Sequence, residues 1–187
     1  AQKELGWLGF GPLSSKVLAH PAPDLAVLDV AIKRIGVADQ LVVLEGQTIR
    51  NEPGMRQLAH NGWNLAEINA RYEQFLEMFR PIMKAAGQSL KIDEKQAFIA
   101  RTLLIQEYRK VLLRDPQLPQ ELLPADWKGA AAYQLCRNLY LSTYLEADRY
   151  LDSALETTDG PLPPPGPVFW TRFGGLQEAE YPRASND

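Results

Sequence analysis

Apolar side chains recur at helical spacing through most of residues 63–157, and this pattern limits the possible folds more than any other feature. The first stripe consists of Leu65, Ile68, Tyr72, Phe75 and Phe79. The second consists of Ala97, Ala100, Leu104, Tyr108 and Val111, widened by Ile105 and Leu112. The third consists of Leu135, Cys136, Leu139, Tyr140, Ala147, Tyr150, Leu151 and Leu155. Each stripe gives a helix one apolar face, so we predict a three-helix domain over residues 63–157.

Capping patterns indicate where these three helices begin. Asn64 with Glu67, and Asp93 with Gln96, match a capping box, in which two side chains satisfy the free N–H groups of a first helical turn. Asp126 has the character of a cap for the last helix. These positions predict helix starts near residues 64, 93 and 126.

Residues 1–50 predict a smaller region of mixed helix and strand. A short helix ends near Gly9, and Leu13–His20 is an extended segment, either one strand or a tight hairpin. Asp24–Gly36 has the cap, apolar spacing and terminal glycine of a helix. Leu41–Leu44 is a short apolar run expected to form a buried strand. A helix that returns to a strand indicates part of a ferredoxin-like domain, so the predicted fold class is α+β.

Two further segments have compositions of their own. Residues 51–62 form a polar connector, predicted to hold a helical turn, and the whole stretch Gln47–Gly62 is the natural moving joint. Residues 158–187 form a proline-rich tail, which continues into the Arg172–Gly175 segment. We expect Phe169–Trp170 and Phe173–Gly175 to dock on the helices.

Composition narrows the class of protein. The 187 residues include 20 Lys and Arg against 23 Asp and Glu, for a net charge of -3. An autonomous nucleic-acid-binding domain carries a basic surplus instead. Cys136 is the single cysteine and cannot form an internal disulfide, which favours a reduced, cytoplasmic compartment. The sequence holds no apolar run near the ~18–20 residues that a membrane span needs.

Catalytic and metal-binding patterns are not evident in the sequence. His20 and His60 are far apart, and neither has a second ligand at metal-binding spacing. Cys136 has no partner that would make it a nucleophile, and the acids of residues 1–50 form no clustered pair. We therefore expect no metal, no cofactor and no enzymatic activity.

One long motif carries a family resemblance. Residues 108–129 read YRKVLLRDPQLPQELLPADWKG and resemble the C-terminal signature of PaaX-like repressors of phenylacetate catabolism. Ala132–Tyr140 is also similar, and so is the tail from Leu162 to Leu176. Upstream segments at Gly9–Gly11 and Gly36–Asp39 extend the resemblance over nearly the whole chain.

The resemblance implies a three-part repressor. Such proteins have a DNA-binding winged helix, a ferredoxin-like (Cas2-like) middle domain and a helical C-terminal part, and they leave operator DNA when phenylacetyl-CoA binds. This chain lacks the winged helix and the first strand of the middle domain, and we expect both in the native protein. The chain is then the effector-binding and dimerisation portion of a homodimeric repressor that contacts operator DNA through the absent winged helix.

An acyl-CoA effector needs cations for its phosphates and an apolar slot for its acyl group. Arginine suits phosphate because its planar fork donates two parallel hydrogen bonds. The candidate effector-binding residues are Arg109, Arg114, Arg137, Tyr108, Trp127 and Tyr133. Further cations on the helices are Lys110, Arg71, Arg80 and Arg101. The competing interpretation is that the cations are solvated and that the aromatic residues belong to the core, with Trp127 anchoring the connector.

Three functional interpretations remain open on the sequence alone. The first is the effector-binding module, which senses phenylacetyl-CoA or a related aryl-acyl-CoA. The second is a scaffold that dimerises the repressor while the effector binds elsewhere, and extra apolar residues such as Leu76 and Leu113 would serve such an interface as readily as a core. The third is an acyl-CoA-processing enzyme, which is disfavoured because no nucleophile with a general base can be assembled.

Overall fold

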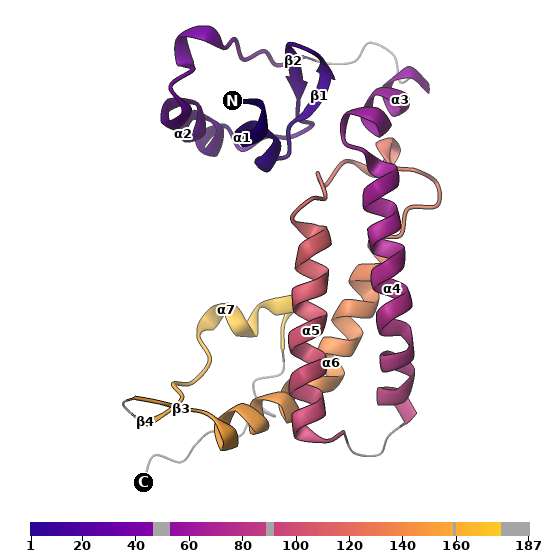
Figure 1. The fold of residues 1–187 in the computed structure, drawn as a ribbon, viewed down its shortest axis with the longest axis vertical. Helices are drawn as coiled ribbons and strands as arrows, with labels where there is room; N and C mark the ends of the chain where they lie inside the picture. The colour runs from indigo at the N-terminus through magenta and orange to yellow at the C-terminus, as the bar shows by residue number, and fades with distance from the viewer. Residues whose placement is uncertain (47–52, 89–91, 159, 177–187) are drawn as a thin grey trace. The chain divides into compact units, whose positions relative to one another are not determined.

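The computed structural model describes residues 1–46, 53–88, 92–158 and 160–176. Its fold is mostly helical with two small two-stranded sheets (Figure 1). The chain forms two compact units: the first comprises residues 1–72 and 110–128, and the second comprises residues 73–109 and the chain from Gly129 onward. Over the described ranges, each helix is too short or too polar to cross a membrane.

The elements follow one another along the chain in this order. The amino-terminal elements are α1 (Gln2–Trp7), β1 (Gly11–Ser14), β2 (Val17–Ala19), α2 (Leu25–Ile35), the 3-10 turn η1 (Ala38–Gln40) and α3 (Pro53–Gly62). The long helices are α4 (Leu65–Gln88), α5 (Glu94–Leu112) and α6 (Gly129–Ala154), with the turn η2 (Gln120–Leu122) between the last two. The tail holds β3 (Glu156–Thr157), β4 (Gly160–Pro161), α7 (Pro167–Trp170) and η3 (Arg172–Gly174).

Of the two forms predicted for Leu13–His20, the structure shows the hairpin, and the helix predicted over Asp24–Gly36 is confirmed. β1 and β2 pair antiparallel, with Gly11 opposite Ala19. Asp24 caps α2, since its carboxylate accepts hydrogen bonds from the backbone N–H groups of Ala26 and Val27 at 2.9 and 3.2 Å. The helix ends at Gly36, whose φ of 71° lies in the left-handed region that glycine adopts without strain.

The buried strand predicted at Leu41–Leu44 is wrong. These residues form no regular secondary structure, and Val42 and Leu44 are 80% and 85% exposed. Within this run, only Leu41 packs against the core of Leu5, Leu28 and Ile32. Strand formers become a strand only beside a partner, and β1 and β2 pair with each other. The ferredoxin-like, Cas2-like character of residues 1–50 is not shown and stays a prediction.

The connector contains more helix than the single turn predicted. Residues 53–62 form α3, which starts with Pro53 where a proline is tolerated; residues 47–52 lie outside the described ranges. Trp63 then ties this segment to the amino-terminal elements of the first unit. Its indole N–H donates to the carbonyl of Gly9 at 2.7 Å, and a Cβ on Gly11 would come within 2.5 Å of its ring.

Helices α4 and α5 bury the faces that their apolar spacing predicts. The whole first stripe, from Leu65 to Phe79, is buried. Asp93 caps α5 by accepting from the backbone N–H of Gln96 at 2.9 Å. At the start of α4 the capping-box pair makes a different contact, because the amide of Asn64 donates to the carboxylate of Glu67 at 2.7 Å.

In the second unit, parts of α4, α5 and α6 pack into a helical bundle. Rings of Phe75 and Tyr108 join α4 to α5 with centroids 5.5 Å apart, and rings of Phe98 and Tyr150 join α5 to α6 at 5.3 Å. The predicted apolar stripes extend beyond the buried parts of the helices, since Leu155 is 46% exposed just after α6. Leu112, which ends α5 in the first unit, is also exposed rather than part of a core.

The connector between α5 and α6 is held by side chains of α4 within the first unit. The hydroxyl of Tyr72 donates to the carboxylate of Asp115 at 2.6 Å, and its ring meets Trp127 edge-on at 5.6 Å. Asn69 accepts from the backbone N–H of Lys128 at 2.8 Å, directly before α6 begins. The predicted cap Asp126 instead accepts a hydrogen bond from the Asn69 amide. Trp127 therefore packs as an anchor of the connector.

Candidate functional site

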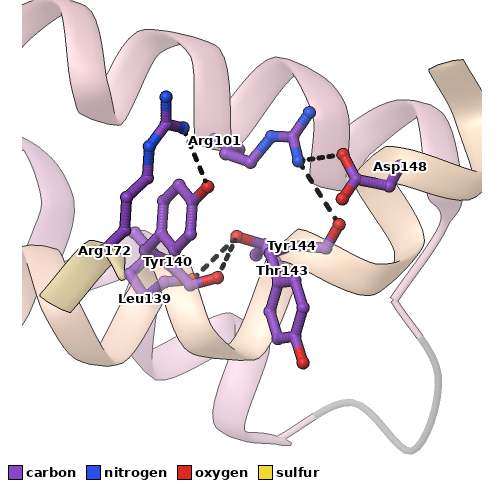
Figure 2. A network of polar contacts seen from close by, with 7 residues as sticks. All are labelled: Arg101, Leu139, Tyr140, Thr143, Tyr144, Asp148 and Arg172. Carbon is purple, nitrogen blue, oxygen red and sulfur yellow. Dashed lines mark hydrogen bonds and ion pairs between the residues drawn. The ribbon is translucent and has the colours of Figure 1, made fainter. Parts of the chain in front are cut away.

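A pocket of about 370 Å³ lies in the second unit among α5, α6 and the tail. Its polar lining includes Arg101 on α5, Tyr140, Asp148 and Asp152 on α6, and Arg172 in the tail. Figure 2 shows all of these side chains except that of Asp152 converging from the two helices and the tail. Its apolar lining includes Ile105, Leu151, Leu162, Pro163, Pro165 and Phe169. The volume falls in the usual range for small-molecule sites.

Arg101 and Asp148 form a buried ion pair at one wall of this pocket. Their side chains are 12% and 7% exposed. One guanidinium nitrogen of Arg101 donates to Oδ1 of Asp148, and the same nitrogen donates to the backbone carbonyl of Tyr144 at 3.4 Å (Figure 2). Burial raises the pKa of the Asp148 carboxyl, against the opposing influence of the Arg101 hydrogen bond and charge.

The second carboxylate oxygen of Asp148 is buried without a hydrogen-bond partner among the described residues. Buried polar groups in native proteins are nearly always paired. The neighbouring buried hydroxyl of Thr143 illustrates the rule, because it donates to the carbonyls of Leu139 and Tyr140 within α6. The unpaired oxygen therefore indicates that Asp148 can accept one more hydrogen bond than the described residues supply.

The tail closes the other side of the pocket and is docked by several contacts. Arg172 donates to the hydroxyl of Tyr140 at 3.2 Å and lies 5.6 Å from the ring centre of Phe169. The ring of Phe173 packs on Tyr140 with centroids 5.0 Å apart, and its carbonyl accepts from Arg137 at 3.2 Å. The predicted docking on the helices is thus confirmed for Phe173 and for Phe169, whose ring centroid lies 6.4 Å from that of Tyr144.

This arrangement offers a ligand both charge and apolar surface. Arg101 and Arg172 have more N–H groups than their described hydrogen bonds use, so they can donate further hydrogen bonds to an anionic or carbonyl oxygen of a ligand. Phe169 and the leucines and prolines of the tail supply an apolar wall. A pocket of this kind suits a small organic ligand that has an apolar body and a few polar atoms.

Comparison with known proteins assigns the helical part to a family. Residues 63–153 match the PaaX-like protein C-terminal domain. The chain is also 38% identical over 178 residues to the transcriptional repressor PaaX of Escherichia coli strain K12. This chain belongs to the PaaX-like family. The alignment covers 94% of this chain and 56% of the repressor, so the chain spans about half the length of that curated relative.

The name of that relative describes a transcriptional repressor and not an enzyme. The match to the PaaX-like C-terminal domain includes Arg101 and Asp148, whereas Arg172 lies beyond its end. The pocket therefore combines the helical domain of the family with the tail that follows it.

The candidate residues proposed from the sequence fall in different places in this PaaX-like chain. Tyr133 and Arg137 lie on α6 and both reach Phe173, so they flank the docked tail. Tyr108 is 8% exposed and packs on Phe75 in the core of the second unit. Arg109 is exposed near the end of α5. None of these four residues lines the pocket, and their contact with an effector stays a prediction.

The other two candidates lie in the first unit. Trp127 packs edge-on against Tyr72. Arg114 is exposed and lines a separate, open cavity of about 760 Å³ with the aromatic rings of Trp7, Phe10 and Trp63. Burial lowers the pKa of His20 in the same cavity, so its imidazole is more often neutral than a free one.

The sequence interpretation did not select Asp148, Tyr140 or Arg172, and it named Arg101 only among the further cations. The sequence does contain a pattern that indicates two of these residues, Arg101 and Asp148. Arg101 lies four residues after Ala97 and three before Leu104, on the buried face of α5. Asp148 has the same relation to Tyr144 and Leu151 on α6. Opposite charges on two apolar faces are evidence of a buried pair, because either one alone would be costly.

Proposed function

We propose that this chain is the effector-binding and dimerisation portion of a bacterial transcriptional repressor of phenylacetate-degradation genes, and that phenylacetyl-CoA releases the repressor from operator DNA. The observation that carries this proposal is the pocket of Arg101, Asp148 and Arg172 under the docked tail. The relationship to a transcriptional repressor supplies the regulatory context. The complete repressor would bind operator DNA through a winged helix that this chain lacks, and the chain would itself catalyse no reaction.

The pocket supports an effector role because its walls come from separate parts of the chain. Helices α5 and α6 form one side, and the tail residues Leu162, Phe169 and Arg172 form the other. A ligand that touches both sides stabilises the docked tail, since it binds that conformation better than any other. A repressor whose DNA-binding form has a different tail position would then lose affinity for its operator.

Calorimetric titration of the chain with phenylacetyl-CoA tests this assignment, with coenzyme A and phenylacetate as controls. We expect the thioester to bind more tightly than either control. Arg172→Gln should weaken that binding at least tenfold, because it removes a charged donor from the pocket. Arg109→Gln is the matched control, since it removes an exposed cation outside the pocket.

Either of two results would contradict the assignment. Equal weakening by both substitutions would show that the arginines attract the anionic coenzyme only through overall charge. Unchanged binding by Arg172→Gln would place the effector outside the tail pocket.

A scaffold role is the second candidate, and an exposed apolar pair on α5 favours it. Ile99 and Leu103 are each 46% exposed and lie four residues apart on one helix face. Leu113 is also exposed, whereas Leu76, the other residue proposed for an interface, is buried in the core. We propose a homodimer that uses this face. Ile99→Ser with Leu103→Ser should lower the sedimentation mass from dimer to monomer, and an unchanged mass would reject this face.

The amino-terminal elements enter the proposal as part of a ferredoxin-like, Cas2-like domain. Their hairpin and helix supply pieces that such a domain uses. A structure of the complete repressor in which β1, β2 and α2 belong to one ferredoxin-like domain would support the assignment, and one that left β1 and β2 as an isolated hairpin would reject it.

A further inference from the structure

The second oxygen of Asp148, Oδ2, carries an inference about what the tail pocket selects. Asp148 is 5% exposed, and Oδ2 is buried without a hydrogen-bond partner among the described residues. Its first oxygen already accepts from Arg101. A buried acceptor without a donor raises the free energy of the folded protein. A ligand that donates a hydrogen bond to this oxygen removes that penalty and therefore binds more tightly.

The surrounding charges limit which ligands can bring that donor. Arg172 donates to Tyr140, and its positive charge acts on Asp148 from the tail. Asp152 lines the same pocket and adds a second negative charge near Asp148. A free carboxylate that approached Asp148 would meet two like charges and would offer no donor of its own. A neutral N–H group meets neither obstacle.

We propose that Asp148 is a specificity-determining residue, which accepts a hydrogen bond from a neutral N–H of the bound ligand and so selects an aryl thioester conjugate over the free aromatic acid. This rests on the proposed effector function. In a coenzyme A thioester, the first amide N–H lies two carbons beyond the sulfur, while the acyl group is apolar. The acyl group would lie against Leu162, Pro163 and Phe169. The pocket of about 370 Å³ takes this end of the conjugate, and the nucleotide remains outside.

Two small thioesters of phenylacetate isolate the proposed hydrogen bond. The S-(2-acetamidoethyl) thioester carries the amide N–H, and the S-(4-oxopentyl) thioester replaces only that N–H with a CH2 group and keeps the carbonyl. We expect the chain to bind the first more tightly by roughly tenfold or more, the usual effect of a hydrogen bond to a charged group. Calorimetry on the 187-residue chain with both thioesters and with phenylacetyl-CoA measures this difference without any substitution.

Substitution then assigns the difference to one carboxylate. Asp148→Asn should remove most of the preference for the amide-bearing thioester. Glu77→Gln removes the same charge from an exposed residue of α4 outside the pocket and should leave the preference within about twofold. Thermal melts of both variants establish that the fold is retained, and the comparison of the two thioesters on the unsubstituted chain stands whether or not Asp148→Asn folds.

The outcomes separate this inference from the proposed function. Equal binding of the two thioesters, or a preference that survives in Asp148→Asn, would overturn the role of Asp148 and leave the effector assignment intact. Failure of phenylacetyl-CoA and both thioesters to bind would overturn the proposed function, and this inference with it.

Discussion

Arg101 and Asp148 show how single residues hold the second unit together. Each is placed on an apolar helix face, and each compensates the charge of the other. A buried pair of this kind adds little over a well-packed apolar pair, but loss of one partner leaves the other charge buried and uncompensated. The two residues should therefore behave very differently when they are changed singly and together.

Arg101→Met should lower the free energy of unfolding by about 3–5 kcal/mol, because it leaves Asp148 without its cation. The double variant Arg101→Met with Asp148→Leu should recover most of that loss. Arg149→Met is the control, since Arg149 and Glu146 form an exposed pair that contributes less than about 1 kcal/mol. Urea denaturation measures all three, and equal losses in the single and double variants would refute the pairing.

Cys136 offers a second test at the residue scale. Its side chain is inaccessible, and burial raises the pKa of its thiol to about 12. The thiolate is the reactive form, so the native protein should react with iodoacetamide at pH 8 far more slowly than the protein in urea. Mass spectrometry of the alkylated chain measures the two rates. Equal rates would show that the helical bundle opens readily around α6.

The elements divide into those that local spacing predicts and those that it does not. The stripe from Leu65 to Phe79 predicts α4 because each apolar residue falls on one buried face. Asp24 and Gly36 predict α2 because cap chemistry is local. Leu41–Leu44 was wrongly predicted as a strand because strand formation depends on a partner that local spacing does not reveal.

The site was harder to predict than the helices for a related reason. Arg101 and Asp148 are 47 residues apart, and their meeting depends on how α5 packs on α6. Arg172 reaches the pocket because the tail docks on aromatic rings of α6. The docking itself was predicted from Phe169 and Phe173, but the charges that it brings together follow from packing that the sequence alone does not specify.

The tail gives a prediction at the element scale. Phe173 packs on Tyr140 and Tyr133, and its carbonyl accepts from Arg137. Phe173→Ala should release this contact and speed amide hydrogen exchange in α7 and η3 by tenfold or more. Val168→Ala is the control, because Val168 lies in α7 of the same tail and is 74% exposed. Unchanged exchange in Phe173→Ala would mean that other contacts hold the tail.

The contact between Trp63 and the amino-terminal hairpin gives a second prediction at the element scale. A Cβ at residue 11 would press on the Trp63 ring at 2.5 Å, so Gly11→Ala should destabilise the first unit by about 1–3 kcal/mol. Gly54→Ala is a contrasting control, since that helical glycine has open space around it, and alanine there should stabilise α3 slightly. Thermal melts measure both, and equal signs would contradict the assignment of this contact.

At the scale of the whole molecule, a PaaX-like C-terminal domain is followed by a tail that closes a pocket on it. The family relationship links the chain to a transcriptional repressor, and the chain spans about half the length of that relative. The two units are each built from two separate stretches of chain, since α4 and α5 run through both. A ligand that changes the tail therefore acts on a unit that shares two continuous helices with the other.

Hydrogen exchange with and without phenylacetyl-CoA tests whether the tail pocket is the effector site. We expect the ligand to slow exchange in α7, in η3 and in the parts of α5 and α6 around Arg101 and Asp148. Coenzyme A alone should leave these segments unchanged. Slower exchange confined to the first unit, with the tail unaffected, would contradict the tail pocket as the effector site.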